Sequence, residues 1–324
     1  MPKPRLPALQ ALTPRPAMQE AIESFFSRGR ARNLSPRTLD FYRERLGRFT
    51  RYLEGRGLEV APEQVTSDVI RDFLASECER TSAATANHGF VTLRAFFRFL
   101  VREDVLTVNP MEKVEKPRVA RKVVQTFSAA QVEALLATCN GRSFNGARLR
   151  AVILVLLDTG LRVSELCGLT LESVSWDEGT LRVMGKGSKE RVVPFGEATR
   201  QALMVYLTKR GKLPGQQAVF VTCYGDPLNR HEAHRILSEA GRRAGLSGVR
   251  CSPHTFRHTC AVFYLRNGGD AFTLQKLLGH ASLEMTRRYC ELSQTDTVAK
   301  HRQCSPGDRF MGPARQGGQR TRLS

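Results

Sequence analysis

Residues 148–160 read RLRAVILVLLDTG, and the central run 151–157 is apolar throughout. A helix that is apolar on nearly every side cannot face water, so this stretch predicts a helix at the buried centre of a domain. Upstream, SAAQ at 128–131 has the pattern of a capping box and predicts the start of another helix. Downstream, TLRVMGKGSKERVVPF at 180–195 has two β-rich runs around a glycine–lysine turn, which predicts a hairpin.

Helical patterns dominate the rest of the chain. Before the buried helix, apolar spacing and caps predict four helices, at residues 17–31, 36–54, 67–79 and 84–102. The second begins at a Ser35 cap and carries arginines at positions 37, 43, 45, 48 and 51 beside its apolar stripe. These arginines indicate either an ordinary solvated face or contacts to phosphate, and the net charge favours phosphate for some of them. After Ala198 we expect helices again, except for a short extended piece at AVFVTC (218–223).

Composition indicates a two-domain protein with a polyanionic partner. The chain has 324 residues, enough for two cores, and its 50 lysines and arginines against 31 acidic residues give a net charge of +19. Such an excess favours nucleic acid before a membrane surface. No 18-residue apolar run and no signal peptide are present, so we expect a cytoplasmic protein. The eight cysteines are scattered without a C-x-x-C pair and are expected to be reduced packing residues.

Two segments lack apolar periodicity. NPMEKVEKPRVARKVV, residues 109–124, is charged and punctuated by two prolines, which is typical of a linker between domains. The stretch from Ser305 to the end is rich in glycine, proline and arginine and is expected to be a flexible tail.

The stretch CSPHTFRHT at 251–259 concentrates basic side chains at an expected helix start. Ser252 suits the N-cap and the following proline the first helical position, so His254 and Arg257 fall three residues apart on one face. A helix N-terminus carries partial positive charge and free N–H groups, so the added basic groups favour an anion such as phosphate. Two other interpretations stay open. His254 and His258 have the spacing of a zinc pair, although the glutamate of the metalloprotease pattern is missing, and the basic helix end could simply be solvated.

Four more side chains could join this site, and each also has an ordinary structural explanation. They are Arg162 in TGLRVSEL, Lys186 in GKGSKER, and His280 and Tyr289 in LLGHASLEMTRRY. Arg162 could form an ion pair with Glu165 on a helix surface, worth only a few tenths of a kcal/mol. Lys186 could be an exposed turn lysine, His280 a helix cap and Tyr289 a packing aromatic.

Together these residue types match the needs of phosphodiester cleavage. Attack by an oxygen nucleophile adds negative charge to the phosphate oxygens, which two arginines can clamp without a metal. Lys186 could protonate the leaving 5′-oxygen, and His254 could accept the proton of an attacking phenol. Tyrosine is a plausible covalent nucleophile, and its phosphate ester retains the energy of the broken linkage, so resealing requires no ATP and no cofactor.

The order of the motifs TGLRVSEL, GKGSKERVVPF, HTFRHT and LLGH, with a tyrosine nine residues on, resembles that of the tyrosine recombinases, the phage integrase family. The chain is most similar to the compact Xer-type members, strongly over residues 126–292 and more loosely over 15–105. The resemblance implies roles for six residues: Arg162 and Arg257 as phosphate clamps, Lys186 as general acid, His254 as general base, His280 as a hydrogen-bond donor to the transition state, and Tyr289 as the nucleophile.

The resemblance also implies a mainly helical fold with two domains closed around duplex DNA. We expect a four-helix, SAM-like core-binding domain at 15–108, the linker at 109–124, a mostly helical catalytic domain with a small antiparallel β-sheet at 125–304, and a disordered tail at 305–324. The implied activity is site-specific recombination through a 3′-phosphotyrosine, by a homotetramer or mixed tetramer on paired sites, with no cofactor, metal or membrane. Two alternatives stay open: relaxation of the type IB topoisomerase kind, and a non-catalytic DNA-binding regulator on a recombinase fold.

Overall fold

The structure is a computed structural model that describes residues 17–58, 61–120, 124–185, 190–280, 282–293, 301–302 and 305–307. The chain divides into two compact units between Lys122 and Val123. Both units are mainly helical and the second adds a small antiparallel sheet, which confirms the predicted fold class. In the described parts of the chain, no helix has the length and apolar character needed to cross a membrane. The tail predicted from Ser305 lies outside the described residues, apart from 305–307.

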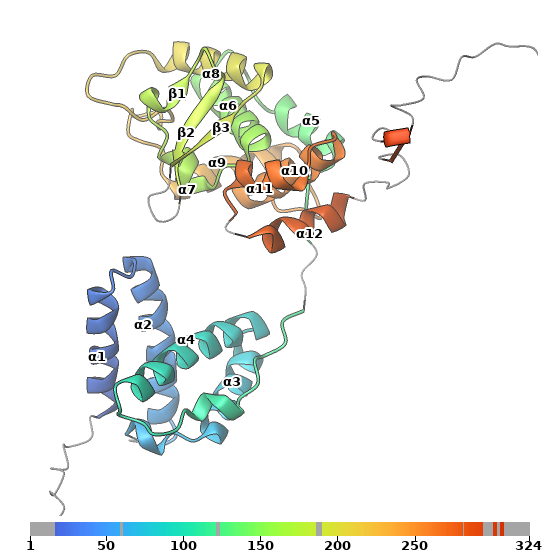
Figure 1. The fold of residues 1–324 in the computed structure, drawn as a ribbon. Helices are drawn as coiled ribbons and strands as arrows, with labels where there is room; N and C mark the ends of the chain where they lie inside the picture. Colours follow the sequence, from blue (N-terminus) through green and yellow to red (C-terminus); the bar gives the residue numbers. More distant parts are fainter. Residues whose placement is uncertain are drawn as a thin grey trace, which may run out of the picture. The chain divides into compact units, whose positions relative to one another are not determined.

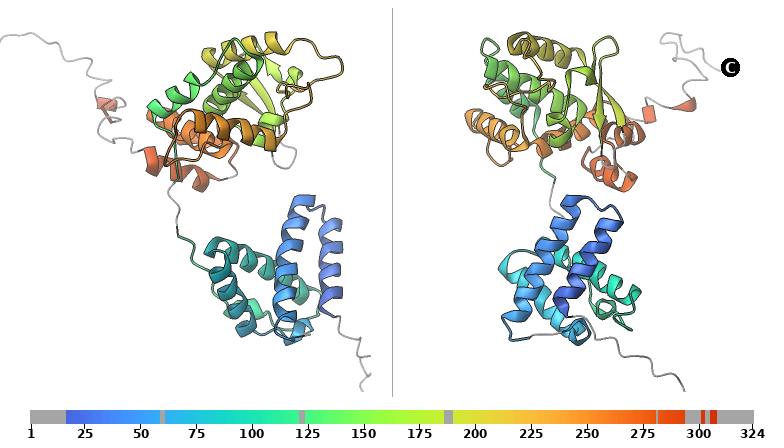
Figure 2. Two further views of the ribbon diagram at one scale, coloured as in Figure 1. Left: turned by 180° about the vertical axis from the view of Figure 1, so that it is seen from behind. Right: turned by 90° about the vertical axis from the view of Figure 1, so that its left-hand side faces the viewer.

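The first unit contains the four helices that apolar spacing predicted. They are α1 (Met18–Ala31), α2 (Pro36–Glu54), α3 (Ser67–Arg80) and α4 (Ala83–Arg102), with short 3₁₀ helices η1 (Pro62–Gln64) and η2 (Pro110–Lys113). Figures 1 and 2 show α1 and α2 side by side. Ser35 caps α2 as expected, because its hydroxyl accepts a hydrogen bond from the Thr38 backbone N–H at 3.2 Å.

Aromatic rings fill the core of the first unit. Phe49, Phe96 and Phe97 are fully buried, and the ring of Phe49 meets that of Phe73 edge-on at 5.1 Å. Such pairs add to the stabilisation from burial alone. The 3₁₀ helix η2, within the stretch expected as a linker, contributes buried Met111 to this core.

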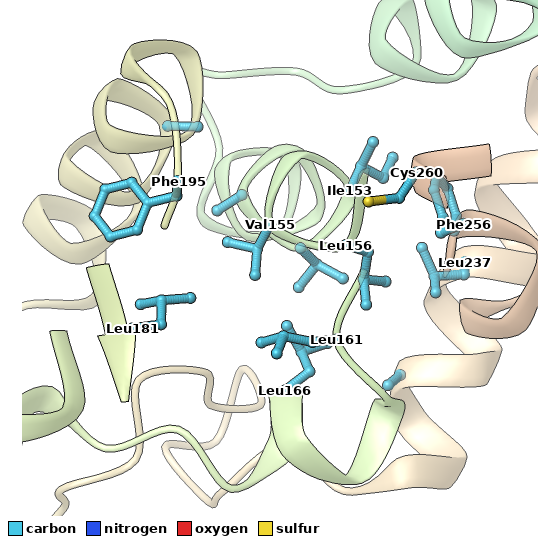
Figure 3. Packing of buried hydrophobic residues seen from close by; sticks show 14 of the residues in the cluster. Ile153, Val155, Leu156, Leu161, Leu166, Leu181, Phe195, Leu237, Phe256 and Cys260 are labelled. Carbon is cyan, nitrogen blue, oxygen red and sulfur yellow. The ribbon is translucent and has the colours of Figure 1, made fainter. Parts of the chain in front are cut away.

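The second unit is built around α6 (Phe144–Thr159), which contains the apolar run that predicted a buried centre. No surface is exposed on five side chains of this run: Ala151, Val152, Ile153, Val155 and Leu156. Figure 3 shows α6 nearly end-on with apolar side chains on several sides of it. The preceding helix, α5 (Ala129–Ala137), begins at the predicted capping box.

A three-stranded antiparallel sheet, in the order β1-β2-β3, contributes buried side chains to the same core as α6. The predicted hairpin forms from β2 (Thr180–Met184) and β3 (Glu190–Pro194), in a register that pairs Leu181 with Val193. Both of these side chains are fully buried, so one face of the hairpin packs on the core. The first strand, β1 (Val174–Ser175), was not predicted, because two residues are too short to show an alternating pattern.

Helices form most of the remaining chain, as expected. They are α7 (Val163–Cys167), α8 (Glu197–Arg210), α9 (Arg230–Arg243), α10 (Pro253–Arg266), α11 (Ala271–Leu278) and α12 (Leu283–Ser293), with a 3₁₀ helix η3 (Leu171–Ser173). The piece AVFVTC, expected to be extended, forms no strand in its described residues but makes isolated bridges from Ala218 to Thr170 and from Val221 to Pro227. Helix α10 packs on α6 and also contacts α11 and α12, so segments distant in sequence meet at its N-terminal end.

Candidate active site

Arg257 is a buried cation fixed by backbone carbonyls. It lies in the first turns of α10, which begins at the predicted Ser252 cap, and it is only 4% exposed. Its two terminal nitrogens donate hydrogen bonds to the Gly160 carbonyl at 2.6 Å and the Leu278 carbonyl at 2.7 Å. Burial and the nearby charge of Arg162 lower its pKa to about 10, so the side chain stays charged at neutral pH. The guanidinium has five N–H donors, so further donors remain for a ligand.

The Gly160 carbonyl that holds Arg257 belongs to a position that requires glycine. Gly160 ends α6 in the left-handed conformation, with φ of +59°. A Cβ atom at this position would lie 2.5 Å from the Leu278 side chain and 3.2 Å from the Cys260 sulfur. Neither the backbone nor the space therefore accepts a larger residue.

Arg162 stands at the N-terminus of α7 and shares a carboxylate with a second arginine. Glu165 accepts hydrogen bonds from the Arg162 backbone N–H at 2.8 Å and from its Nη1 at 2.9 Å. Arg191 on β3 donates to both oxygens of the same carboxylate, at 2.8 and 2.9 Å. Burial alone would raise the pKa of Glu165, but the hydrogen bonds from Arg191 and Arg162 outweigh it and lower the pKa.

The ion pair with Glu165, which was the alternative explanation for Arg162, therefore exists, but its carboxylate is buried. The Glu165 side chain is only 4% exposed and that of Arg162 is 37% exposed. The interpretation from the sequence assumed a solvated pair on one helix, and it missed Arg191, which lies on a strand 26 residues after Glu165.

Arg191 also joins the hairpin to the turn between α11 and α12. Its Nε donates to the Leu277 carbonyl at 3.2 Å, and a Cβ atom on Gly279 would lie 3.1 Å from that nitrogen. In the same turn, the Gly279 carbonyl lies 3.4 Å from the Arg162 Nη2. The strand, α7 and the turn thus meet around two guanidinium groups.

His280 follows in this turn and packs against Tyr289 of α12. The two rings are stacked at 6.1 Å with 12° between their planes, and His280 is 8% exposed. Its Nδ1 lies 3.0 Å from the Thr286 hydroxyl, which fixes the ring. Burial and the charges of Arg257 and Arg162 lower the pKa of His280 to about 4, so the imidazole is neutral at physiological pH.

The Tyr289 hydroxyl is buried and hydrogen-bonded to His258. The tyrosine is 5% exposed, and its hydroxyl oxygen lies 2.7 Å from the His258 Nδ1. Burial raises the pKa of Tyr289, opposed by the positive charge of Arg257, so the phenol is protonated at neutral pH.

His254, the histidine expected to accept the tyrosine proton, is exposed on the first turn of α10. Its ring meets that of His258 edge-on at 4.7 Å. Although the residue is exposed, its ring is partly shielded from solvent, and this shielding and the nearby charges of Arg257 and Arg162 lower its pKa. Lys186, the expected general acid, lies outside the described residues, as does Lys189.

The sequence itself matches known proteins at both units. Residues 125–295 match the phage integrase family, and residues 22–104 match the SAM-like N-terminal domain of phage integrases. The chain belongs to the phage integrase family. Membership confirms the resemblance seen in the four sequence motifs.

Curated relatives of this integrase-family chain are tyrosine recombinases. Tyrosine recombinase XerD of Pseudomonas aeruginosa is 37% identical over 279 residues, which cover 83% of this chain and 92% of the relative. Tyrosine recombinase XerC of Pelobacter propionicus is 35% identical over 263 residues, which cover 81% of this chain and 87% of the relative. The shared length includes both units of the chain.

Solved structures show the same fold. XerH site-specific recombinase, in a post-cleavage complex with a palindromic difH substrate, superposes with a TM-score of 0.70 at 20% identity, covering 86% of this chain and 82% of that one. A lambda integrase dimer bound to a COC′ core site gives a TM-score of 0.69 at 21% identity, covering 85% and 77%.

In this integrase-family protein, five of the six predicted side chains meet near the N-terminal end of α10. They are Arg162, His254, Arg257, His280 and Tyr289, which hydrogen bonds, ring contacts and mutual charge effects connect. Sequence reasoning missed Arg191 and His258 as parts of this cluster. The signal for His258 was its spacing from His254, which suggested only a zinc pair, and Arg191 looked like an ordinary strand residue.

Proposed function

We propose that this protein is a site-specific DNA recombinase that cleaves and rejoins strands through a covalent 3′-phosphotyrosine at Tyr289. The observation that carries the proposal is the convergence of a buried phenol, two arginines and three imidazoles at one helix end. Membership of the phage integrase family and similarity to XerD and XerC support it.

Arg162 and Arg257 have different surroundings, and both suit binding of the same phosphate. Arg162 is partly exposed and Arg257 is held by two carbonyls, so one can reach a phosphate and the other is already oriented. Both present planar pairs of donors to the added charge of the pentavalent transition state. His280, stacked on Tyr289 and neutral, is placed to donate a hydrogen bond to the same phosphate.

The proposed reaction balances without a cofactor. A bond forms between the Tyr289 oxygen and phosphorus, and the bond from phosphorus to the 5′-oxygen breaks. The phenol gives up one proton, for which the family resemblance implies His254 as acceptor, and the leaving 5′-oxygen takes one proton from Lys186. Rejoining reverses each transfer, because the phosphotyrosine ester keeps the energy of the linkage.

Duplex DNA is the proposed partner, and the basic side chains of the first unit favour α4 for part of the contact. Three α2 arginines pair with carboxylates: Arg43 with Asp40, Arg45 with Glu44, and Arg48 with Glu44 and Glu77. On α4, Arg94, Arg98 and Arg102 are exposed, recur every four residues and form no ion pair with any side chain in the described ranges. Neutralising them should lower the salt dependence of DNA binding, by a slope of about 0.9 for each lost phosphate contact.

The assembly and the domain limits are also proposals. XerH and lambda integrase were solved on DNA sites, the latter as a dimer, and we propose that this chain likewise acts on paired sites as a homotetramer or mixed tetramer. We propose the core-binding domain at 15–108, the linker at 109–124, the catalytic domain at 125–304 and the tail at 305–324. We also propose that the protein acts in the cytoplasm, because its proposed substrate is DNA.

Capture of covalent DNA adducts tests the function and finds the target together. The protein is incubated with a library of nicked duplexes, denatured, and the DNA that stays attached is sequenced. We expect enrichment of one sequence with the wild type and no adduct with Tyr289→Phe, which lacks only the phenolic oxygen. Tyr264→Phe is the matched control, since that hydroxyl contacts Thr273 at 2.9 Å instead.

Three results would contradict the proposal in different ways. An adduct that survives Tyr289→Phe would move the nucleophile to another residue. DNA binding without any adduct would favour a non-catalytic regulator. Relaxation of supercoiled DNA without sequence preference or strand exchange would favour the topoisomerase alternative.

A further inference from the structure

The ring of His258 contacts the hydroxyl oxygen of Tyr289, which is the atom proposed to attack phosphorus. The 2.7 Å separation of the hydroxyl oxygen from Nδ1 is typical of a strong O–H···N hydrogen bond. We infer that His258, rather than His254, takes the phenolic proton when Tyr289 attacks DNA. This inference rests on the proposed function, because it gives His258 a role only if Tyr289 is the nucleophile.

The direction of the hydrogen bond follows from the two ionisation states. Burial raises the pKa of Tyr289, so the phenol keeps its proton and acts as donor. Burial, together with His254, Arg257 and Arg288, lowers the pKa of His258 to about 4, so its ring is neutral. A neutral ring has one nitrogen with a free lone pair, and a protonated phenol facing Nδ1 selects the tautomer in which Nδ1 is that acceptor.

Among the residues that the structure describes, no negative charge acts on His258 to keep a proton on it. His254 and Arg257 lie on its own helix, and Arg288 and Tyr289 face it from α12. From the turn between α11 and α12, His280 is also within electrostatic range. All of these groups are positive or neutral, so a proton accepted by His258 is returned readily when the tyrosine becomes the leaving group.

His254 is less well placed for this transfer. The residue is exposed and its ring lies edge-on to His258, one imidazole farther from the tyrosine oxygen. Its pKa responds to Arg257 and Arg162, which are the proposed phosphate clamps. A position beside the clamps suits contact with the phosphate itself.

The inferred step balances. As the bond between the Tyr289 oxygen and phosphorus forms, the phenolic O–H bond breaks and the proton moves to Nδ1 of His258, which becomes an imidazolium. The bond to the 5′-oxygen breaks, and that oxygen is protonated by the hairpin acid. In rejoining, the imidazolium returns its proton to the tyrosine oxygen.

The test compares His258→Asn with His254→Asn in the full chain. Asparagine can place an amide oxygen near the former Nδ1, so it keeps a hydrogen-bond acceptor but cannot take a proton at neutral pH. The substrate is a nicked duplex that carries the sequence recovered by adduct capture. The single-turnover rate of adduct formation is measured from pH 6.5 to 9, with DNA affinity and melting temperature as checks on folding.

We expect His258→Asn to be slowed about 100-fold or more at pH 7, the usual contribution of a positioned base. Its rate should rise roughly tenfold per pH unit, because the phenolate fraction grows by that factor below the tyrosine pKa. The wild type and His254→Asn should show a much flatter profile, whatever their absolute rates. Added imidazole should partly restore His258→Ala and not His258→Asn, whose side chain occupies the space.

A flat profile for His258→Asn would overturn the inference and leave His258 as a positioning residue. A rising profile for His254→Asn alone would return the role to His254. Faster cleavage by His258→Asn would show that the hydrogen bond only restrains the tyrosine. If His258→Asn fails to fold, His258→Gln carries the same comparison. Adducts that survive Tyr289→Phe would remove the proposed function itself, an outcome separate from all of these.

Discussion

Replacing Glu165 by glutamine tests the carboxylate shared by Arg162 and Arg191. The change keeps the volume of the side chain but removes its charge, and only one of its two oxygens remains. The carboxylate accepts four hydrogen bonds of 2.8 to 2.9 Å, so at least one arginine N–H group would face an NH₂ group. Breaking a buried ion pair from one side costs about 3 to 5 kcal/mol.

The lower end of that range applies here, because the Arg162 side chain is 37% exposed and can turn its donors to water. A loss of about 3 kcal/mol in the free energy of unfolding corresponds to a melting temperature lower by roughly 6 to 12 °C in a unit of this size. Scanning calorimetry of the full chain measures this shift. Glu239→Gln is the control, since Glu239 pairs with Arg242 at 2.7 Å on an exposed helix face and should leave the melting temperature unchanged.

Adduct formation provides the second readout for Glu165→Gln. The variant should also cleave more slowly, because the Arg162 guanidinium loses the partner that orients it. Melting within 2 °C of the wild type (about the shift expected from less than 1 kcal/mol) would refute the energetic argument. Normal cleavage by a clearly destabilised variant would refute the positioning of Arg162 by Glu165.

Three further predictions concern the remaining groups. Arg257→Lys keeps a charge but loses the planar fork, so adduct formation should slow by about 100-fold or more with little change in DNA affinity; an unchanged rate would leave Arg257 a structural role only. Lys186→Ala should be slow on a natural strand and largely rescued when sulfur replaces the scissile 5′-oxygen, whereas Lys189→Ala should gain no rescue; the reverse result would exchange the two roles. The pKa of both His258 and His280 falls to about 4, so the unfolded state binds more protons than the folded state between pH 6.5 and 4. The free energy of unfolding should therefore decline as the pH falls from 6.5 to 4, by on the order of 1 kcal/mol per pH unit for each histidine. In urea titrations, His258→Asn should show a smaller decline than the wild type, and an equal decline would contradict a neutral His258.

Local signals predicted the helices well. Ser35, Ser128 and Ser252 each cap the helix that their neighbours predicted, because capping depends on a few adjacent residues. The apolar run 151–157 predicted the central helix, since a helix without a polar side has to be buried. The two-residue strand β1 could not be predicted, because it exists only through pairing with β2.

The contacts within the candidate site could not be predicted from the sequence. Motifs identified Arg162 and Tyr289 as candidates, but their contacts join separate elements, with 117 residues between Arg162 and Gly279 and 31 between Tyr289 and His258. The sequence pairs Glu165 with the nearby Arg162, and its second partner, Arg191 of β3, is brought to it only by the fold. In the same way, four-residue spacing related His258 to His254 on one helix, and only the fold brings α12 and its tyrosine to it.

The crowding at Gly160 has a consequence for how this sequence can drift through evolution. Two features prevent substitution at position 160: its left-handed backbone and the two side chains that fill the space beside it. Cys260 and Leu278 share that space, so a gain in volume at one should be tolerated chiefly with a loss at the other. In the lineages that descend from this protein, the side-chain volumes at positions 260 and 278 should therefore change together in opposite directions. The glycine that supplies the carbonyl to Arg257 should stay unchanged.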